Sequence, residues 1–79
     1  METSGVCRCF GDHLRAIRTK QGVSQEKLAE LASLDRTYIS SVERGKRNIS
    51  LINIFKIAGA LHLPPSSLLD FSVGKLREE

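Results

Sequence analysis

Membrane-spanning segments, secretion signals and the common catalytic motifs are all absent from this sequence. In its 79 residues, no apolar run approaches the roughly 20 residues that a membrane helix needs. The first residues do not show the charged-then-apolar order of a secretory signal. There is no phosphate-binding glycine loop, no H-E-x-x-H motif and no Cys–His–acid spacing of a nucleophilic enzyme. We therefore expect a cytoplasmic protein that has no membrane partner and is not an enzyme.

Cysteine and histidine are too few for a metal site of the usual kind. The two cysteines, Cys7 and Cys9, are separated by one residue, which is too close for an ordinary structural disulfide. A zinc site needs about four ligands, and only His13 and His62 could add to the two thiols. We expect no metal and no cofactor, and two reduced thiols in or beside an irregular tail over residues 1–8.

Aromatic residues are also scarce, and the excess of positive charge is small. The chain has no Trp, one Tyr and three Phe, but its hydrophobic content of 41% is enough for one core. A single domain of this size buries little of its surface, so oligomerisation is a natural source of added stability. Twelve Lys and Arg against nine Asp and Glu give a net charge of +3, which is compatible with a nucleic-acid partner.

The spacing of apolar residues predicts an all-α fold. No segment alternates with the period of a β-strand, whereas Phe10, Leu14 and Ile17 are spaced by four and three residues, as on one face of a helix. The predicted helices cover about 9–21, 25–32, 36–44 and 51–61, a fifth begins at Pro65, and residues 9–79 form one domain.

Residues that start and stop helices support these bounds. Ser24, Asp35 and Ser50 are N-cap candidates, while Gly22 and Gly45 follow the first and third helices as glycine often does. The fourth helix is expected to face inward with Leu51, Ile54, Ile57, Ala58 and Leu61.

Two short helices separated by three residues, over about 25–44, predict a helix-turn-helix. Ala29 is small where the helices cross, and Ile39 and Val42 anchor the second helix. Its first residues would then point at base edges in the major groove of double-stranded DNA. Arg36 can donate two hydrogen bonds to guanine, and Thr37 offers a methyl and a hydroxyl. The outward face consists of Arg36, Thr37, Ser40, Ser41 and Arg44, with Tyr38 to one side.

Helix starts and long cations flank this face, and these are the groups that bind phosphates. The predicted phosphate binders are Ser24 and Gln25 before it and Arg44, Lys46, Arg47 and Asn48 after it. Ile52 and Phe55 lie off the inward stripe of the fourth helix. Either the fifth helix or the tail covers them, or they form a dimer interface beside Leu69, Phe71 or Val73.

From Phe10 to about Phe71 the chain resembles the phage-repressor-type helix-turn-helix family, also called the Xre or Cro/C1 family. The segments "LDRTYIS" and "ERGKRNISL" are similar to those of controller proteins of restriction–modification systems. The resemblance implies a compact five-helix, lambda-repressor-like domain that dimerises on a pseudo-palindromic operator. It implies regulation of the protein's own gene and of the nuclease gene, with RNA polymerase as a further partner, at the nucleoid of a prokaryote.

The resemblance also implies roles for single residues. Gln25 matches a glutamine that contacts a phosphate, Arg36, Thr37 and Ser41 match base-facing positions, and Tyr38 matches a tyrosine near the DNA. Arg47 and Asn48 match a loop that follows the backbone. Arg18 and Glu43 match a partly buried ion pair that would hold Arg18 near a phosphate. The family often has a glycine where this chain has Ser33.

Two other functions fit the same residues. One is a phage or host repressor unrelated to restriction, and the other is an antitoxin-like module that mainly masks a protein partner. Steep salt dependence of DNA binding would distinguish a DNA-binding protein from such a module.

Overall fold

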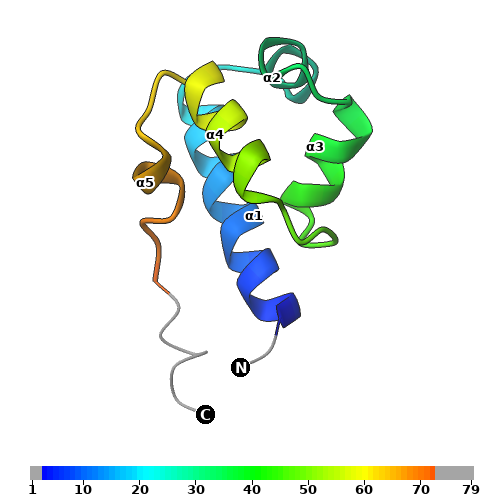
Figure 1. The fold of residues 1–79 in the computed structure, drawn as a ribbon, viewed down its shortest axis with the longest axis vertical. Helices are drawn as coiled ribbons and strands as arrows, with labels where there is room; N and C mark the ends of the chain where they lie inside the picture. The colour runs from blue at the N-terminus through cyan, green and yellow to red at the C-terminus, as the bar shows by residue number, and fades with distance from the viewer. Residues whose placement is uncertain (1–2, 73–79) are drawn as a thin grey trace.

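The computed structural model describes residues 3–72, and in this part of the chain all regular structure is helical (Figure 1). The five helices are α1 (Thr3–Lys20), α2 (Gln25–Ala32), α3 (Arg36–Glu43), α4 (Leu51–Ala60) and α5 (Pro65–Leu68). The predicted all-α class and the order of the five helices are confirmed. None of the helices in residues 3–72 is both long and apolar enough to cross a membrane.

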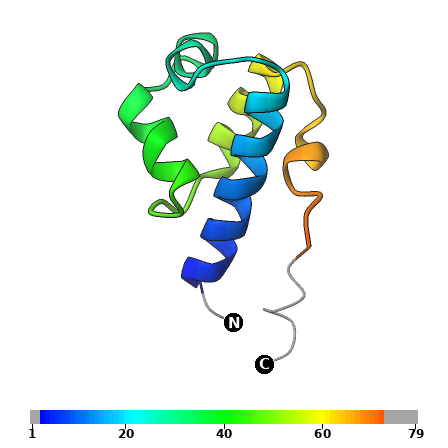
Figure 2. The same cartoon turned by 180° about the vertical axis from the view of Figure 1, so that it is seen from behind.

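α1 is the longest helix, and the other helices are arranged around it (Figures 1 and 2). It packs against α3 on one side and against α5 on the other. α2 packs on both α3 and α4, and α4 also contacts α5. The two helices of the predicted helix-turn-helix therefore form a corner at one end of the domain.

One apolar core lies between all five helices. α2 and α3 contribute the residues that were expected to hold the corner together, because Leu28, Ile39 and Val42 are almost completely buried. The full core consists of Phe10, Leu14, Leu28, Ala29, Ala32, Ile39, Val42, Ile54, Ile57, Ala58, Leu61 and Leu68.

The first helix begins earlier than the sequence pattern suggested. An irregular tail over residues 1–8 is wrong from Thr3 onward, since α1 already includes these turns. Val6 lies four residues before Phe10 and is half-buried, so it extends the same apolar face by one turn. The loop after α3 supports this extension, because Gly45 packs directly on the backbone of Arg8.

Two details of the helix starts differ from prediction. Leu51 was expected to face inward, but 69% of it is exposed, because the first residue of α4 projects away from the core. Asp35 occupies the N-cap position of α3 without a side-chain hydrogen bond. Ser24 and Ser50 do cap their helices, accepting from the backbone N–H of Lys27 at 2.9 Å and of Asn53 at 3.1 Å.

Phe71 packs within the chain. Its ring lies edge-on to Phe10, with ring centroids 6.3 Å apart, and its centroid is 5.4 Å from that of His13. His13 in turn donates from Nε2 to the carbonyl of Ser67 at 2.8 Å. Phe71 therefore helps to hold the segment after α5 onto α1, while Val73 lies outside the described residues.

The turn between α2 and α3 contains a serine in the left-handed region. Ser33 has φ 58° and ψ 45°, which confirms the strain expected where the family often has glycine. Replacing Ser33 with glycine should raise the free energy of unfolding by up to about 1 kcal/mol, because glycine adopts this conformation without a steric penalty. Urea denaturation would measure the gain. A Ser66→Gly variant in α5 is the control and should not be stabilised; equal gains would contradict the strain at Ser33.

Candidate nucleic-acid interface

The outer face of α3 is polar and open, as its sequence predicts. Arg36 and Thr37 are exposed in the first turn, and Ser40 and Ser41 are half-buried one turn later. Arg44 follows the helix and donates from Nη1 to the hydroxyl of Ser40. Because Ile39 and Val42 are buried on the opposite side, this face cannot turn inward without exposing the core.

A buried ion pair fixes the end of α3 to α1. Arg18 donates from Nε to Glu43 Oε2 at 2.6 Å and from Nη2 to Oε1 at 3.0 Å. The third donor, Nη1, binds the carbonyl of Val23 at 2.8 Å. The predicted pair of Arg18 and Glu43 is thus confirmed, and 8% of Arg18 and 6% of Glu43 remain exposed.

The ion pair favours the charged form of Arg18. Its hydrogen bond to Glu43 raises the pKa of Arg18 above the ordinary value, burial opposes this, and the nearby carboxylate charge adds to it. Gln25, the first residue of α2, also donates to Glu43, from Nε2 to Oε1 at 3.0 Å. The Glu43 carboxylate of α3 is therefore bound by Arg18 of α1 and by Gln25 of α2, and it joins these three helices.

The loop after α3 is held by Tyr38. The guanidinium carbon of Arg47 lies 5.2 Å from the centre of the Tyr38 ring, within cation–π range. The hydroxyl of Tyr38 accepts from Asn53 Nδ2 at 3.0 Å. The family resemblance implies that Tyr38 lies near the DNA, but it did not reveal Asn53 as a partner of its hydroxyl. Lys46 and Asn48 are exposed in the same loop.

Some residues at this surface were not singled out from sequence. Arg8 and Arg15 of α1 share a hollow with Arg44 and Lys46 at the end of α3. Arg8 and Arg15 are seven residues apart, or two helical turns, so they lie on the same face of a helix. This spacing indicates a shared face only once it is known that α1 begins at Thr3 and includes Arg8.

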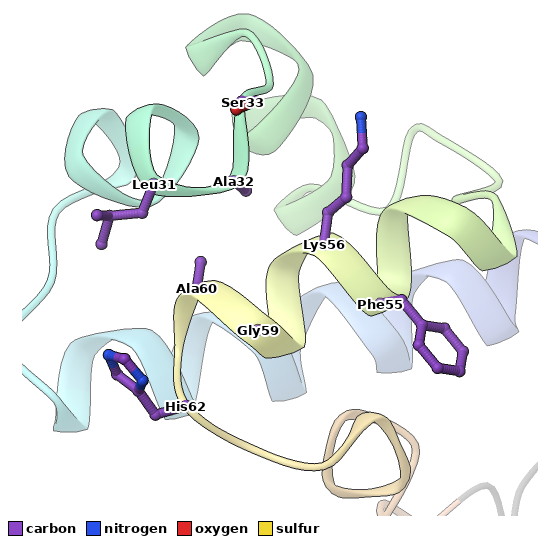
Figure 3. Close-up of a pocket in the computed structure, with 8 residues that line it drawn as sticks. All are labelled: Leu31, Ala32, Ser33, Phe55, Lys56, Gly59, Ala60 and His62. Atoms are coloured by element: carbon purple, nitrogen blue, oxygen red, sulfur yellow. The ribbon is translucent and has the colours of Figure 1, made fainter.

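A second surface feature is an open groove between α2 and α4, away from the outer face of α3. Leu31 projects from α2 at one end, and Phe55 from α4 at the other (Figure 3). Phe55 is 57% exposed and Ile52, one turn earlier, is 70% exposed, so neither the tail segment up to Ser72 nor α5 covers them. Leu31, for which the sequence suggested no role, is 50% exposed beside this groove.

Cys7 and Cys9 are half-buried free thiols on α1. No group of three or more His, Cys, Asp or Glu side chains in the described part of the chain is placed to hold a metal ion.

Comparison with known proteins agrees with this geometry. Residues 14–68 match the model of a helix-turn-helix family. The chain is 52% identical over 71 residues to the control protein C.BamHI of Bacillus amyloliquefaciens, covering 89% of this chain and 88% of that protein. It is 48% identical over 60 residues to the control protein C.MunI of a Mycoplasma species, covering 75% and 81%.

Solved structures give the same result. The restriction–modification controller protein C.AhdI of Aeromonas hydrophila superimposes with a TM-score of 0.77 at 53% identity, covering 78% of this chain and 94% of that one. These relatives are transcriptional regulators rather than enzymes, as the missing catalytic motifs led us to expect. The chain is therefore a DNA-binding transcriptional regulator of the helix-turn-helix family, similar over most of its length to restriction–modification control proteins.

Proposed function

We propose that this protein is the controller of a restriction–modification system, acting as a homodimer on a pseudo-palindromic operator upstream of its own gene and the endonuclease gene. The observation that carries the proposal is the outer face of α3, where Arg36 and Thr37 are exposed above a buried anchor of Ile39 and Val42. A recognition helix held in this way can enter a major groove with its first turn leading.

The two kinds of DNA contact would be divided between different residues. Arg36, Thr37, Tyr38, Ser40 and Ser41 would read bases. The exposed Lys46, Arg47 and Asn48, with Arg44 and the capped start of α2 at Ser24 and Gln25, would bind phosphates. Arg18 would act indirectly, by holding α1 to the end of α3, since three of its five N–H donors bind Glu43 and Val23.

Dimerisation would place two recognition helices about 34 Å apart, one turn of DNA. Ile52 and Phe55 on α4 and Leu69 after α5, which is 53% exposed, would supply the apolar side chains of a two-fold contact. Because dimerisation depends on concentration, operator occupancy would rise steeply as the protein accumulates. A dimer bound at the nucleoid would then recruit or block RNA polymerase according to the position of its site.

Replacing Phe55 with alanine should weaken the dimer by about tenfold, or about 1.4 kcal/mol, because the ring is the largest exposed apolar group on α4. Sedimentation equilibrium would measure the change, and the same samples would be titrated with DNA from upstream of the gene. Phe71→Ala is a matched control: its ring packs on Phe10, so it should lower thermal stability more than dimer affinity.

Two results would contradict the proposal. A Phe55→Ala protein that stays fully dimeric would place the interface elsewhere. A wild-type protein that binds upstream DNA no better than mixed-sequence DNA, with little dependence on salt, would exclude the controller function and favour a module that masks a protein partner.

A further inference from the structure

A hollow of about 320 Å³ lies between α1 and the C-terminal end of α3, next to the outer face of α3. Arg8 and Arg15 line it from α1, and Arg44 and Lys46 line it from the end of α3 and the following loop. The helix-turn-helix family match begins at residue 14. Arg8 therefore belongs to a part of α1 that the family match does not include.

Two glycines bring these charges together by letting backbones approach closely. A Cβ on Gly11 would lie 2.7 Å from the carbonyl oxygen of Glu43 and would also clash with that of Val42. A Cβ on Gly45 would lie 2.8 Å from Arg8 Cα, and the φ of 75° at Gly45 disfavours other residues as well. α1 is thus held directly against the end of the recognition helix, and Arg8 is fixed beside the loop that carries Lys46.

The hollow has an excess of positive charge. Two carboxylates line it, but Glu43 is already bound by Arg18 and Gln25. Asp12 is the one acidic group left to offset Arg8, Arg15, Arg44 and Lys46. Within residues 3–72, neither Arg8 nor Arg15 makes an ion pair, and both are exposed.

The hollow is also continuous with the outer face of α3. Arg44 lines it and at the same time donates to Ser40, which belongs to that face. A duplex whose major groove holds α3 has its phosphates at the edges of that groove, beside the ends of the helix.

We propose that this hollow binds a phosphate group of the duplex that α3 reads, with Arg8 and Arg15 as the added phosphate ligands; this rests on the proposed function. Guanidinium groups suit this ligand because their planar donors match phosphate oxygens in pairs. The contact extends the DNA surface from the helix-turn-helix onto the first half of α1.

Two other roles for these arginines make different predictions. They could offset the negative end of the α3 dipole and the charge of Asp12, in which case their loss would lower stability and leave DNA binding unchanged. They could also bind an acidic protein, in which case their loss would impair transcription without changing DNA affinity.

The test is an Arg8→Gln/Arg15→Gln double variant of the full chain, titrated by fluorescence anisotropy with duplex DNA from upstream of the gene over a range of salt concentrations. Each phosphate that is neutralised contributes about 0.9 to the slope of log affinity against log salt, so loss of this single phosphate site should lower the slope by about 0.9. Affinity at about 0.1 M salt should fall by at least tenfold.

Two single variants serve as controls. Lys20→Gln removes a cation from the last turn of the same helix, outside the hollow, and should leave both slope and affinity unchanged. Asp12→Asn removes the acid from the hollow and should tighten binding, which is the opposite sign. Thermal unfolding of each variant shows whether the fold is intact.

A double variant that folds and keeps the wild-type slope would overturn the phosphate site, whether or not its stability or its effect on transcription changes. That outcome leaves the proposed function standing, because the wild-type protein still binds upstream DNA. Failure of the wild-type protein to bind would instead remove the proposed function and this inference together.

Discussion

Replacing Glu43 with alanine should lower the free energy of unfolding by about 3–5 kcal/mol, because it leaves the buried guanidinium of Arg18 without its counter-ion. Two hydrogen bonds from Arg18 and one from Gln25 would be lost at once. A domain of this size is stabilised by only about 5–15 kcal/mol, so much of its stability would disappear. Thermal and urea denaturation would measure the loss.

The matched control is Glu30→Ala. Glu30 pairs with Lys27 at 3.5 Å, but more than half of each side chain is exposed, so its loss should change stability by less than about 0.5 kcal/mol. Replacing the pair together, with Arg18→Met and Glu43→Leu, should recover most of the loss, because no unpaired charge remains buried. Equal effects of Glu43→Ala and Glu30→Ala would show that the Arg18–Glu43 pair contributes little.

The pH dependence of this effect follows from the direction of the Arg18 shift. A raised pKa stabilises the fold at every pH below the ordinary arginine value, and this stabilisation is lost only as pH rises through the still higher value in the folded protein. Glu43→Ala lowers the free energy of unfolding partly through Arg18. That part of the loss should therefore be the same at about pH 7 and about pH 9.

Replacing Arg36 with alanine should remove discrimination at one base pair of the operator, with a loss of about 1–3 kcal/mol for the preferred sequence. Arg36 is exposed in the first turn of α3, so its loss should not disturb the core. Affinity would be measured for the operator and for operators with single base changes. The variant should bind the wild-type operator and one altered operator equally well.

Arg47→Ala is the contrasting variant, because the loop cation is proposed to bind a phosphate. It should weaken binding to all sequences to the same extent and reduce the salt slope by about 0.9. If Arg36→Ala kept the wild-type order of preference among altered operators, α3 would not be reading bases through this side chain.

Helices whose apolar spacing and caps agree could be predicted closely from sequence. The bounds 25–32 are confirmed for α2, and α3 and α4 each end one residue earlier than expected. The start of α1 was missed because its first turns contain Gly5 and are held by a tertiary contact, between Arg8 and Gly45, that local pattern does not encode. Leu51 shows that apolar spacing does not predict burial reliably at a helix end, where a side chain can project away from the core.

Contacts between distant segments were harder to predict. The pair of Arg18 and Glu43 is separated by 25 residues and was expected only from the family resemblance. The contacts of Tyr38 with Arg47 and Asn53 depend on the path of the loop after α3, which sequence spacing does not determine. The DNA roles of the residues on α3 and its loop stay predictions, since each depends on a partner molecule.

The contact between Arg47 and the Tyr38 ring has a consequence for the thermodynamics of binding. A free arginine side chain has about 2 kcal/mol of rotamer entropy, part of which is lost when it binds a phosphate. Here the ring restricts Arg47 beforehand, and Asn53 in turn holds the ring through its hydroxyl. Arg47 thus loses part of its rotamer freedom during folding. Less entropy is then lost when Arg47 binds a phosphate, so the contact is more favourable.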